Sequence, residues 1–345
     1  MHFYNSLLSW YLQNKRDLPW RNTTDPYPIW LSEIMLQQTR VAQGLPYFMS
    51  FMEAFPTVFD LAKADEEQVL KLWQGLGYYS RARNMHQTAK IIAHEFNGIF
   101  PNNYHDLLQL KGIGQYTAAA IASFAFNEAV PVVDGNVFRV LARYLNVSTD
   151  IASAAAKKEF TELAQELMPN DNPAQFNQAI MEFGALQCVP KNPNCSQCVL
   201  NSSCAALQKG TVSQLPIKLK KTKVTNRYIN YIVLLDPAQH TLINKRTEKG
   251  IWHNLYEFPC IETETEMDYA SVNHLILEQF QNYNIESVVP FNTSTIIHKL
   301  SHQKLHINFF SVGVNQEIPN GIATEEIKKY PFPIVIYNFI EKYSI

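Results

Sequence analysis

Four cysteines stand close together in the chain with the spacing C-x6-C-x2-C-x5-C: Cys188, Cys195, Cys198 and Cys204. Four thiolates in so short a loop are ligands for a [4Fe–4S] cluster or for zinc. Disulfide bonds are rare in cytosolic helical enzymes, so we expect metal ligation instead. The residue types alone leave iron–sulfur and zinc both open. Cys260 stands apart, and we expect a plain buried thiol there.

One carboxylate lies in an apolar stretch, WLSEIMLQQT, from Trp30 to Thr39. The commonest place for a glutamate is a solvated helix surface, but the apolar flanks of Glu33 favour burial of this predicted helix. Burial raises the pKa of a carboxyl group, and a neutral glutamic acid can act as a general acid. Gln37 and Gln38 follow on the same helix and can equally be plain polar residues.

A tight Gly-x-Gly turn joins two predicted helices within the stretch from Leu110 to Arg143. Gly112 and Gly114 allow positive φ and bring backbone N–H groups close to a ligand. An Ala-rich helix begins directly behind them, and its N-terminal amides suit a phosphate group. A Gly-x-Gly alone is weak evidence and is compatible with an ordinary helix–helix turn. An extended apolar run then leads to Asp134, a favoured N-cap at the start of another helix.

The stretch from Trp73 to Arg83, WQGLGYYSRAR, places aromatic rings beside cations. Its glycines interrupt a helix, and Tyr78 and Tyr79 are followed closely by Arg81 and Arg83. This pattern predicts either an intercalating ring with phosphate-binding arginines or a buried tyrosine pair. The segment alone does not separate the two.

Charge is distributed unevenly along the 345 residues, whose net charge is −2. Residues 1–182 carry a net charge of −4, residues 183–235 carry +7 with no carboxylate, and residues 236–345 carry −5. A basic block between two acidic parts suggests contact with a polyanion there. For residues 218–227 alone, a solvated lysine-rich linker is an equal alternative.

The elements that must position these residues change in type along the chain. Up to about residue 206 the apolar residues keep helical spacing, as in Val69, Leu72, Trp73 and Leu76, and again in Met85, Ala89, Ile92 and Phe96. Short β-rich runs follow the linker, at 228–235, 241–244, 294–297 and 305–312, interrupted by one helical segment near 272–283. The sequence therefore predicts a helical domain over 1–206, a basic linker over 207–226 and an α+β domain over 227–345.

The N-terminus carries no secretory signal, and no apolar run is long enough to span a membrane. We therefore expect a soluble, intracellular protein.

Together these motifs resemble the MutY branch of the endonuclease III superfamily of DNA glycosylases. The likeness rests on RDLPWR from Arg16 to Arg21, on the helix containing Glu33, on the Gly-x-Gly turn and on the cysteine spacing. It implies a mainly α catalytic domain of helix-hairpin-helix fold and a Nudix-like α+β C-terminal domain. It also favours a [4Fe–4S] cluster over zinc at the cysteines.

The resemblance implies an adenine DNA glycosylase that flips adenine, mispaired with 8-oxoguanine or guanine, out of the duplex and excises it. Neutral Glu33 would protonate the adenine, and ionised Asp134 would stabilise the cationic sugar, electrostatically or through a transient covalent bond. Tyr116 would support Asp134 through a hydrogen bond. It stands where endonuclease III-like lyases carry a Schiff-base lysine, and a phenol cannot form an imine.

The resemblance also assigns residues to the DNA and to the extruded base, namely Arg21, Gln37, Gln38, Tyr78, Gly112, Gly114, Gln178, Glu182, Ser301 and His302. Among them, Tyr78 would insert into the base stack, and Gln178 and Glu182 would line the adenine pocket. In HKLSHQKLH, Ser301 can accept from N7–H of 8-oxoguanine, and His302 can probe O8 or a phosphate. An exposed His-rich loop is the alternative interpretation of that segment.

GIWHNLYEFP, over residues 250–259, carries the Nudix-like resemblance. No metal-binding Arg-Glu helix follows it, so we expect no pyrophosphatase activity. The partner implied is double-stranded DNA, bound by a monomer in the nucleoid of a bacterial cytoplasm.

Two further functions stay open at this point. An endonuclease III-like glycosylase and AP lyase for oxidised pyrimidines is disfavoured by Tyr116 and by the extra domain. A catalytically silent DNA-damage binder is disfavoured because Glu33 and Asp134 are both present.

Overall fold

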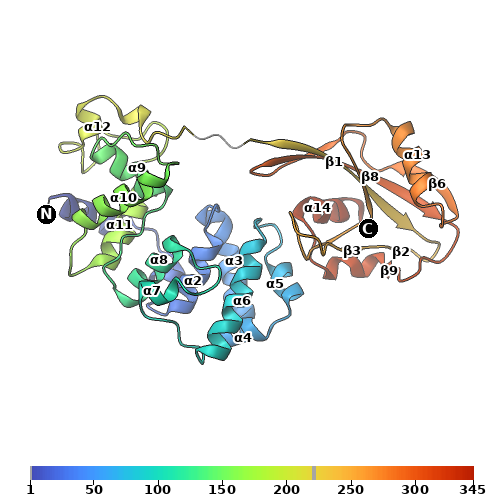
Figure 1. Cartoon of the computed structure of the whole chain (residues 1–345), viewed down its shortest axis with the longest axis horizontal. Helices are drawn as coiled ribbons and strands as arrows, with labels where there is room; N and C mark the ends of the chain where they lie inside the picture. The colour runs from blue at the N-terminus through green and yellow to red at the C-terminus, as the bar shows by residue number, and fades with distance from the viewer. Residues whose placement is uncertain (1, 220–222) are drawn as a thin grey trace. The chain divides into compact units, whose positions relative to one another are not determined.

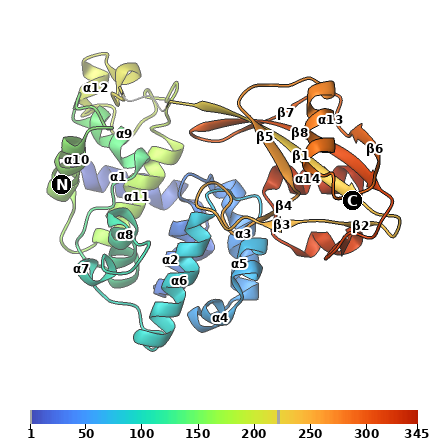
Figure 2. The same ribbon diagram turned by 45° about the vertical axis from the view of Figure 1, so that its right-hand side comes forward.

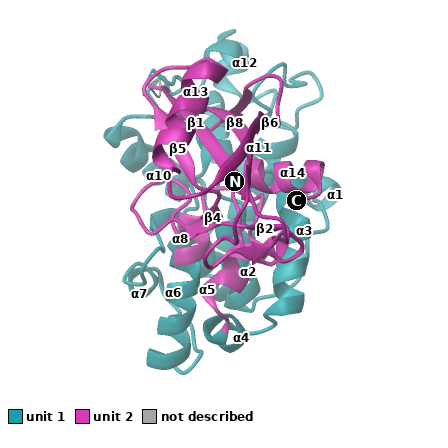
Figure 3. Ribbon diagram, turned by 90° about the vertical axis from the view of Figure 1, so that its right-hand side faces the viewer, with its two compact units in different colours: residues 1–63, 84–220 teal, residues 64–83, 221–345 magenta. Residues whose placement is uncertain are grey.

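The computed structural model, which describes residues 2–219 and 223–345, divides the chain into two compact units (Figures 1 and 3). Unit 1 contains Met1–Lys63 and Asn84–Lys220, and unit 2 contains Ala64–Arg83 and Lys221–Ile345. The last of the three boundaries between the units falls inside the predicted basic linker. The sequence did not predict that residues 64–83 group with the C-terminal part of the chain.

Unit 1 is helical, as predicted. Its α-helices are α1 (His2–Asn14), α2 (Pro26–Met35), α3 (Val41–Ala54), α4 (Val58–Lys63), α7 (Tyr104–Leu107), α8 (Gln115–Phe126), α9 (Gly135–Tyr144), α10 (Ala154–Leu167), α11 (Pro173–Leu186) and α12 (Ala205–Gln208). Two 3-10 turns, η1 (Pro19–Arg21) and η2 (Val212–Gln214), complete it. Helix α6 (Ser80–Glu95) begins in unit 2 and ends in unit 1.

Small side chains explain how the central helices of unit 1 pack. Helix α8 buries a run of alanines between Ala118 and Ala122, and it packs against α2. Short side chains allow the two helices to approach closely. Helices α1, α9 and α11 pack around a separate core that includes Leu7, Leu141 and Phe183. Helical spacing in the sequence places Phe96 on the same apolar face as Met85, Ala89 and Ile92, but Phe96 lies just beyond the end of α6 and is 40% exposed.

Unit 2 is built on one mixed sheet with the strand order β5-β1-β8-β6, and β7 also pairs with β8 (Figure 2). The strands of this sheet are β1 (Thr225–Leu235), β5 (Cys260–Thr263), β6 (Ile285–Pro290), β7 (Ile296–Lys299) and β8 (Gln303–Val314). Strands β1 and β8 run parallel, with Tyr231 opposite Phe309, whereas the other pairs are antiparallel.

Short elements complete unit 2. They are β2 (His240–Thr241), β3 (Asn244–Lys245), β4 (Tyr256–Glu257), β9 (Ile322–Ala323), α5 (Glu66–Leu72), α13 (Tyr269–Gln279), η3 (Thr324–Lys329) and α14 (Ile334–Tyr343). The run predicted as one strand over 241–244 instead joins β2 to β3. Helix α14 was not predicted: the sequence predicts a single helical segment after the linker, and that segment corresponds to α13.

The two longer helices of unit 2 cover opposite faces of its sheet. Successive residues of a strand point to opposite faces. Phe310 belongs to the core that contains Val272 of α13, whereas Phe309 stacks on Phe339 of α14 with ring centroids 3.7 Å apart. This α+β arrangement agrees with the predicted fold class. Within the described residues, no helix is long and apolar enough to cross a membrane.

Polar contacts attach residues 64–83 to the rest of unit 2. Glu67 Oε1 accepts from Lys245 Nζ at 2.7 Å and from the Tyr256 hydroxyl at 2.8 Å. Lys71 Nζ donates to the Lys328 carbonyl at 2.6 Å. Since these partners lie far away in the sequence, helical periodicity could not have predicted the grouping.

Candidate active site

A cavity of about 680 Å³ lies among the helices of unit 1. Six of the predicted site residues line it: Arg21, Glu33, Tyr116, Asp134, Gln178 and Glu182. They meet there because α2 packs against α8, and α11 packs against both α8 and α9. The structure thus places the two predicted catalytic carboxylates around one shared space.

Glu33 lies in the last turn of α2 and is only 6% exposed. The Tyr116 hydroxyl donates to its Oε2 at 2.7 Å. Burial raises the pKa of Glu33 from 4.5 to about 7; the Tyr116 hydrogen bond lowers the pKa, and the negative charge of Asp134 raises it. Near neutral pH a large fraction of Glu33 is therefore protonated and able to donate a proton.

Asp134 is the N-cap of α9, as its position in the sequence predicted. Its Oδ1 accepts from the backbone N–H groups of Asn136 and Val137, both at 2.8 Å, and its Oδ2 accepts from Asn136 Nδ2 at 2.7 Å. Burial raises the pKa of Asp134 above 3.8, and these three hydrogen bonds oppose the rise. Because both oxygens accept from N–H donors, the geometry fits the carboxylate form.

The expected hydrogen bond from Tyr116 to Asp134 is wrong. The Tyr116 hydroxyl donates to Glu33 instead, while the side chain and backbone of Asn136 donate to Asp134. Tyr116 therefore influences the protonation of Glu33, and it is Asn136 that holds the carboxylate of Asp134 in place. Burial and the two nearby carboxylates raise the pKa of Tyr116 well above 10, so the phenol stays a donor.

A hydrogen-bonded chain fixes the orientation of the Asn136 side chain. Arg139 Nη2 donates to Asn136 Oδ1 at 2.8 Å, which leaves the amide nitrogen to face Asp134. The same guanidinium donates to the carbonyl of Gly184 and, through Nε, to the carbonyl of Cys188, both at 2.7 Å. The anion is thus connected to the start of the cysteine loop. Sequence reasoning missed both partners.

Asn177 is a further residue that the sequence analysis missed. It is buried on α11 and holds the extended segment that leads to Asp134. Its Oδ1 accepts from Val132 N at 3.0 Å, and its Nδ2 donates to the Val130 carbonyl and to Ser123 Oγ, both at 2.9 Å. An amide on the apolar face of a predicted helix was the signal that could have revealed it.

Glu182 joins two arginines at the edge of the cavity. Its oxygens accept from Arg16 Nη2 at 2.5 Å and from Arg21 Nη2 at 2.8 Å, and further bonds make both pairs bidentate. Burial acts to raise the pKa of Glu182, but the arginine hydrogen bonds outweigh it and lower the pKa to about 2. One turn earlier on α11, Gln178 Oε1 accepts from the Tyr11 hydroxyl at 2.7 Å.

Of the two glycines in the Gly-x-Gly turn, Gly112 adopts a positive φ, whereas Gly114 is extended with φ −87°. Gly112 has φ +80°, and a Cβ there would lie 2.8 Å from the Cβ of Asn84. Gly114 is the N-cap of α8 and supplies no side chain to the helix start. Gln37 donates to Thr117 Oγ1 of α8 at 3.2 Å, and Gln38 is exposed with φ +57°.

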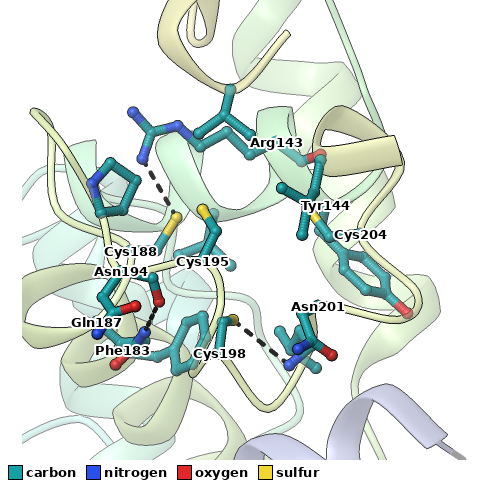
Figure 4. A pocket seen from close by; sticks show the side chains of 15 residues that line it. Arg143, Tyr144, Phe183, Gln187, Cys188, Asn194, Cys195, Cys198, Asn201 and Cys204 are labelled. Carbon is teal, nitrogen blue, oxygen red and sulfur yellow. Dashed lines mark hydrogen bonds between the residues drawn. The ribbon is translucent and has the colours of Figure 1, made fainter. Parts of the chain in front are cut away.

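The four clustered cysteines line one small cavity of about 30 Å³ (Figure 4). Arg143 Nη1 donates to Cys188 Sγ at 3.4 Å, and the backbone N–H of Leu200 donates to Cys198 Sγ at 3.4 Å. As the side chains stand, no group of three or more His, Cys, Asp or Glu in the described part of the chain is arranged to hold a metal ion. Cys260 is partly buried on β5, apart from this loop.

A second pocket, of about 590 Å³, lies within unit 2. Tyr78, Trp252, Ser301 and His302 line it together. Ser301 and His302 belong to the turn between β7 and β8, and Ser301 Oγ lies 3.1 Å from His302 Nδ1. Tyr78 is 47% exposed, whereas Tyr79 is buried, so the two tyrosines do not form a buried pair. Trp252 was not predicted as part of this site.

Comparison with known proteins identifies the family. Residues 31–169 match the model of the HhH-GPD superfamily base excision DNA repair protein, and residues 230–342 match a NUDIX domain. The chain is 36% identical over 315 residues to an adenine DNA glycosylase of Buchnera aphidicola subsp. Baizongia pistaciae, covering 91% of this chain and 87% of that protein. The chain belongs to the adenine DNA glycosylase family.

Other members and solved structures agree with this assignment. The human adenine DNA glycosylase is 46% identical over 222 residues, which cover 62% of this chain and 41% of the human protein. The structure of a thermostable thymine-DNA glycosylase superposes with a TM-score of 0.56 at 30% identity, covering 60% of this chain and 95% of that one. An endonuclease III–DNA complex, with 21% identity and a TM-score of 0.52, shares the fold and covers 61% of this chain and 95% of its own.

As a member of the adenine DNA glycosylase family, the chain is a DNA glycosylase of base excision repair, and its substrate is DNA. The MutY resemblance drawn from the motifs is confirmed. So is the combination of a helix-hairpin-helix domain with a Nudix-like domain.

Proposed function

We propose that this glycosylase releases adenine paired with 8-oxoguanine or guanine, after the adenine is flipped out of double-stranded DNA. One observation carries the proposal: Glu33, with a pKa of about 7, and Asp134, held by three N–H donors, line the same cavity. Cleavage of a glycosidic bond needs an acid for the leaving group and an anion for the oxocarbenium-like sugar. The two carboxyl groups meet both needs in different environments.

Protonated Glu33 gives its proton to the departing adenine, at N7 by analogy with the family. The electron pair of the glycosidic bond leaves with the base, and Asp134 stabilises the cationic sugar until water adds. Asn136 keeps the Asp134 oxygens in place through its backbone and side-chain N–H groups. Gln178 and Glu182 line the space for the base, where Glu182 orients Arg21.

The proposed reaction is monofunctional. An AP lyase needs an amine that forms an imine with the sugar. Among the described residues that line the cavity there is no lysine, and Tyr116 uses its hydroxyl as a donor to Glu33. These observations disfavour the endonuclease III-like alternative.

Several features support binding of duplex DNA. Helix α8 begins directly after Gly114, and we propose that its first N–H groups bind a DNA phosphate. Gln37 and exposed Gln38 lie in the turn just after the helix that carries Glu33, and not on that helix as the sequence predicted. We propose that they fill the gap left by the flipped base. In unit 2, exposed Tyr78 is the residue proposed to insert between bases, and Ser301 and His302 are proposed to read 8-oxoguanine.

We propose a [4Fe–4S] cluster as the cofactor of the cysteine loop. Four thiols around one small cavity supply the donor set, and N–H donors to Cys188 and Cys198 stabilise the thiolates that ligation requires. When bound, the cluster would fix the conformation of the cysteine loop, residues 188–204, which includes Lys191. We further propose that the enzyme acts as a monomer on the nucleoid of a bacterial cell.

Base release tests the proposal directly. The protein is incubated with a duplex carrying A opposite 8-oxoguanine, and strand breaks are compared with and without alkali. We expect breaks only after alkali, and breaks without alkali would favour the lyase. Glu33→Gln should abolish release while binding to the same duplex persists, whereas Lys90→Met, a loss of one charge outside the cavity, should leave both unchanged. If no duplex loses a base, only a binding function remains.

A further inference from the structure

Tyr78 has a backbone conformation that other residues must hold in place. Its φ is +50°, in the left-handed region that side-chain-bearing residues rarely adopt. It follows Gly75 and Gly77, with φ values of +99° and +78°. A non-glycine residue persists in such a conformation only where its surroundings fix it.

The guanidinium of Arg81 contacts both the backbone and the rings of this turn. Its Nη2 donates to the Gly77 carbonyl at 3.0 Å and to the Leu76 carbonyl at 3.5 Å. Its Cζ lies 5.5 Å from the centre of the Tyr78 ring and 5.1 Å from that of the Trp73 ring. One planar cation thus binds the backbone directly before Tyr78 and also contacts the Tyr78 ring.

Other bonds fix the base of the same turn but do not touch the Tyr78 ring. Trp73 Nε1 donates to the Gly77 carbonyl at 2.9 Å. The Tyr79 hydroxyl accepts from Gly75 N at 3.2 Å and donates to the Phe332 carbonyl at 3.4 Å. Arg81 therefore links the fixed part of the turn to its exposed ring.

We propose that Arg81 is a positioning residue for recognition of the mispair: it presents the Tyr78 ring to the pocket that contains Ser301 and His302. This inference rests on the proposed function of Tyr78 as the inserting ring. It replaces the sequence-based interpretation of Arg81 as a phosphate contact. Arg81 is not among the residues that line the pocket, so it acts through Tyr78.

A double-mutant cycle tests this role. Adenine release from A opposite 8-oxoguanine is measured under single-turnover conditions, below saturation, for the wild type, Arg81→Met, Tyr78→Leu and the double variant. Lys90→Met serves as the matched control, because it removes one cation from the same helix. We expect Arg81→Met to lower the apparent second-order rate constant about tenfold. Without the guanidinium, the strained backbone conformation of Tyr78 is no longer held in place. In the Tyr78→Leu background the same change should have less than about a twofold effect.

The salt dependence of DNA affinity separates positioning from phosphate contact. Loss of a residue that neutralises one phosphate reduces the slope of log K against log salt by about one. We expect Arg81→Met to leave the slope equal to that of Lys90→Met. A reduced slope, or a tenfold effect that persists without Tyr78, would overturn the inference.

Two controls keep the outcomes distinct. If Arg81→Met does not fold, judged by its circular dichroism, the cycle is run with Arg81→Lys, which keeps the charge but loses the planar contact with both rings. If the wild type releases no adenine from any duplex, the proposed function itself is wrong. A wild type that is active, with additive effects of the two substitutions, refutes only the role of Arg81.

Discussion

Removing the Tyr116 hydroxyl should move the pH dependence of this glycosylase upward. That hydroxyl donates to Glu33 at 2.7 Å and stabilises the ionised form of the acid. In Tyr116→Phe the ionised form loses this bond, so the pKa of Glu33 should rise. Because protonated Glu33 is the active form, the decline of activity in alkaline solution should begin at a higher pH.

The expected size follows from the strength of the bond. A hydrogen bond to a charged group contributes about 1.5–3 kcal/mol, and one pKa unit corresponds to roughly 1.4 kcal/mol. The hydroxyl also interacts with the protonated form of Glu33, though more weakly. The ionised form is therefore favoured by about 1.5 kcal/mol, the lower end of that range. We expect the pKa of Glu33 to move from about 7 to about 8.

The assay is adenine release under single-turnover conditions. The enzyme concentration exceeds that of the DNA but stays below the dissociation constant of the enzyme–DNA complex. Under these conditions the pH profile reports the pKa values of the free enzyme, which is the state that the structure represents. Tyr104→Phe is the matched control, because Tyr104 is a partly buried tyrosine of unit 1 outside the cavity. Its profile should coincide with that of the wild type.

The position of the alkaline limb decides the outcome, whatever happens to the maximum rate. An unchanged limb would show that Glu33 is not the group that titrates. A limb that moves to lower pH would show that the hydroxyl stabilises the protonated acid, which is the opposite of the expected effect.

Contacts elsewhere in unit 1 lead to three more predictions. Glu182→Gln should lower the free energy of unfolding at neutral pH by about 3 kcal/mol, since the folded pKa of about 2 lies below the ordinary 4.5. In chemical denaturation the difference from the wild type should persist above pH 4.5 and disappear as the pH falls toward 2. Arg139→Met frees the amide that holds Asp134, and we expect single-turnover release to slow by about a hundredfold while affinity for duplex DNA changes little. Equal losses of rate and affinity would point to general unfolding. Gly112→Ala places a Cβ 2.8 Å from Asn84 at a φ of +80°, so its melting temperature should fall, by an amount that corresponds to about 1–3 kcal/mol. An unchanged melting temperature would refute that interpretation of the turn.

Local chemistry explains why so much of the site could be predicted. The apolar flanks of Glu33 belong to the same short helix, so burial could be inferred without knowing the partner helix. An Asp directly before a helix caps it through N–H groups two and three residues ahead, as Asp134 does. The cysteine spacing and the Gly-x-Gly turn are equally local, and Gly112 adopts the positive φ that its type permits.

Contacts between distant residues could not be predicted in the same way. Tyr116 was assigned to the wrong carboxylate because which oxygen lies within reach depends on the packing of α2 against α8. Arg139 and Asn177 have partners on other helices or loops, so their roles exist only once those elements have packed. The grouping of residues 64–83 with the C-terminal part of the chain has the same origin.

The sequence by itself therefore determined the kinds of chemistry available: a buried acid, a capped anion, four thiols, and a ring that follows two glycines. The tertiary structure decided which groups share a cavity and which hydrogen bond sets the pKa of each. It also decided that Arg81 binds the turn before Tyr78. The reason is physical: burial and capping depend on neighbours within a few residues, whereas a hydrogen bond requires two groups within about 3 Å of each other, and only packing brings distant parts of a chain that close.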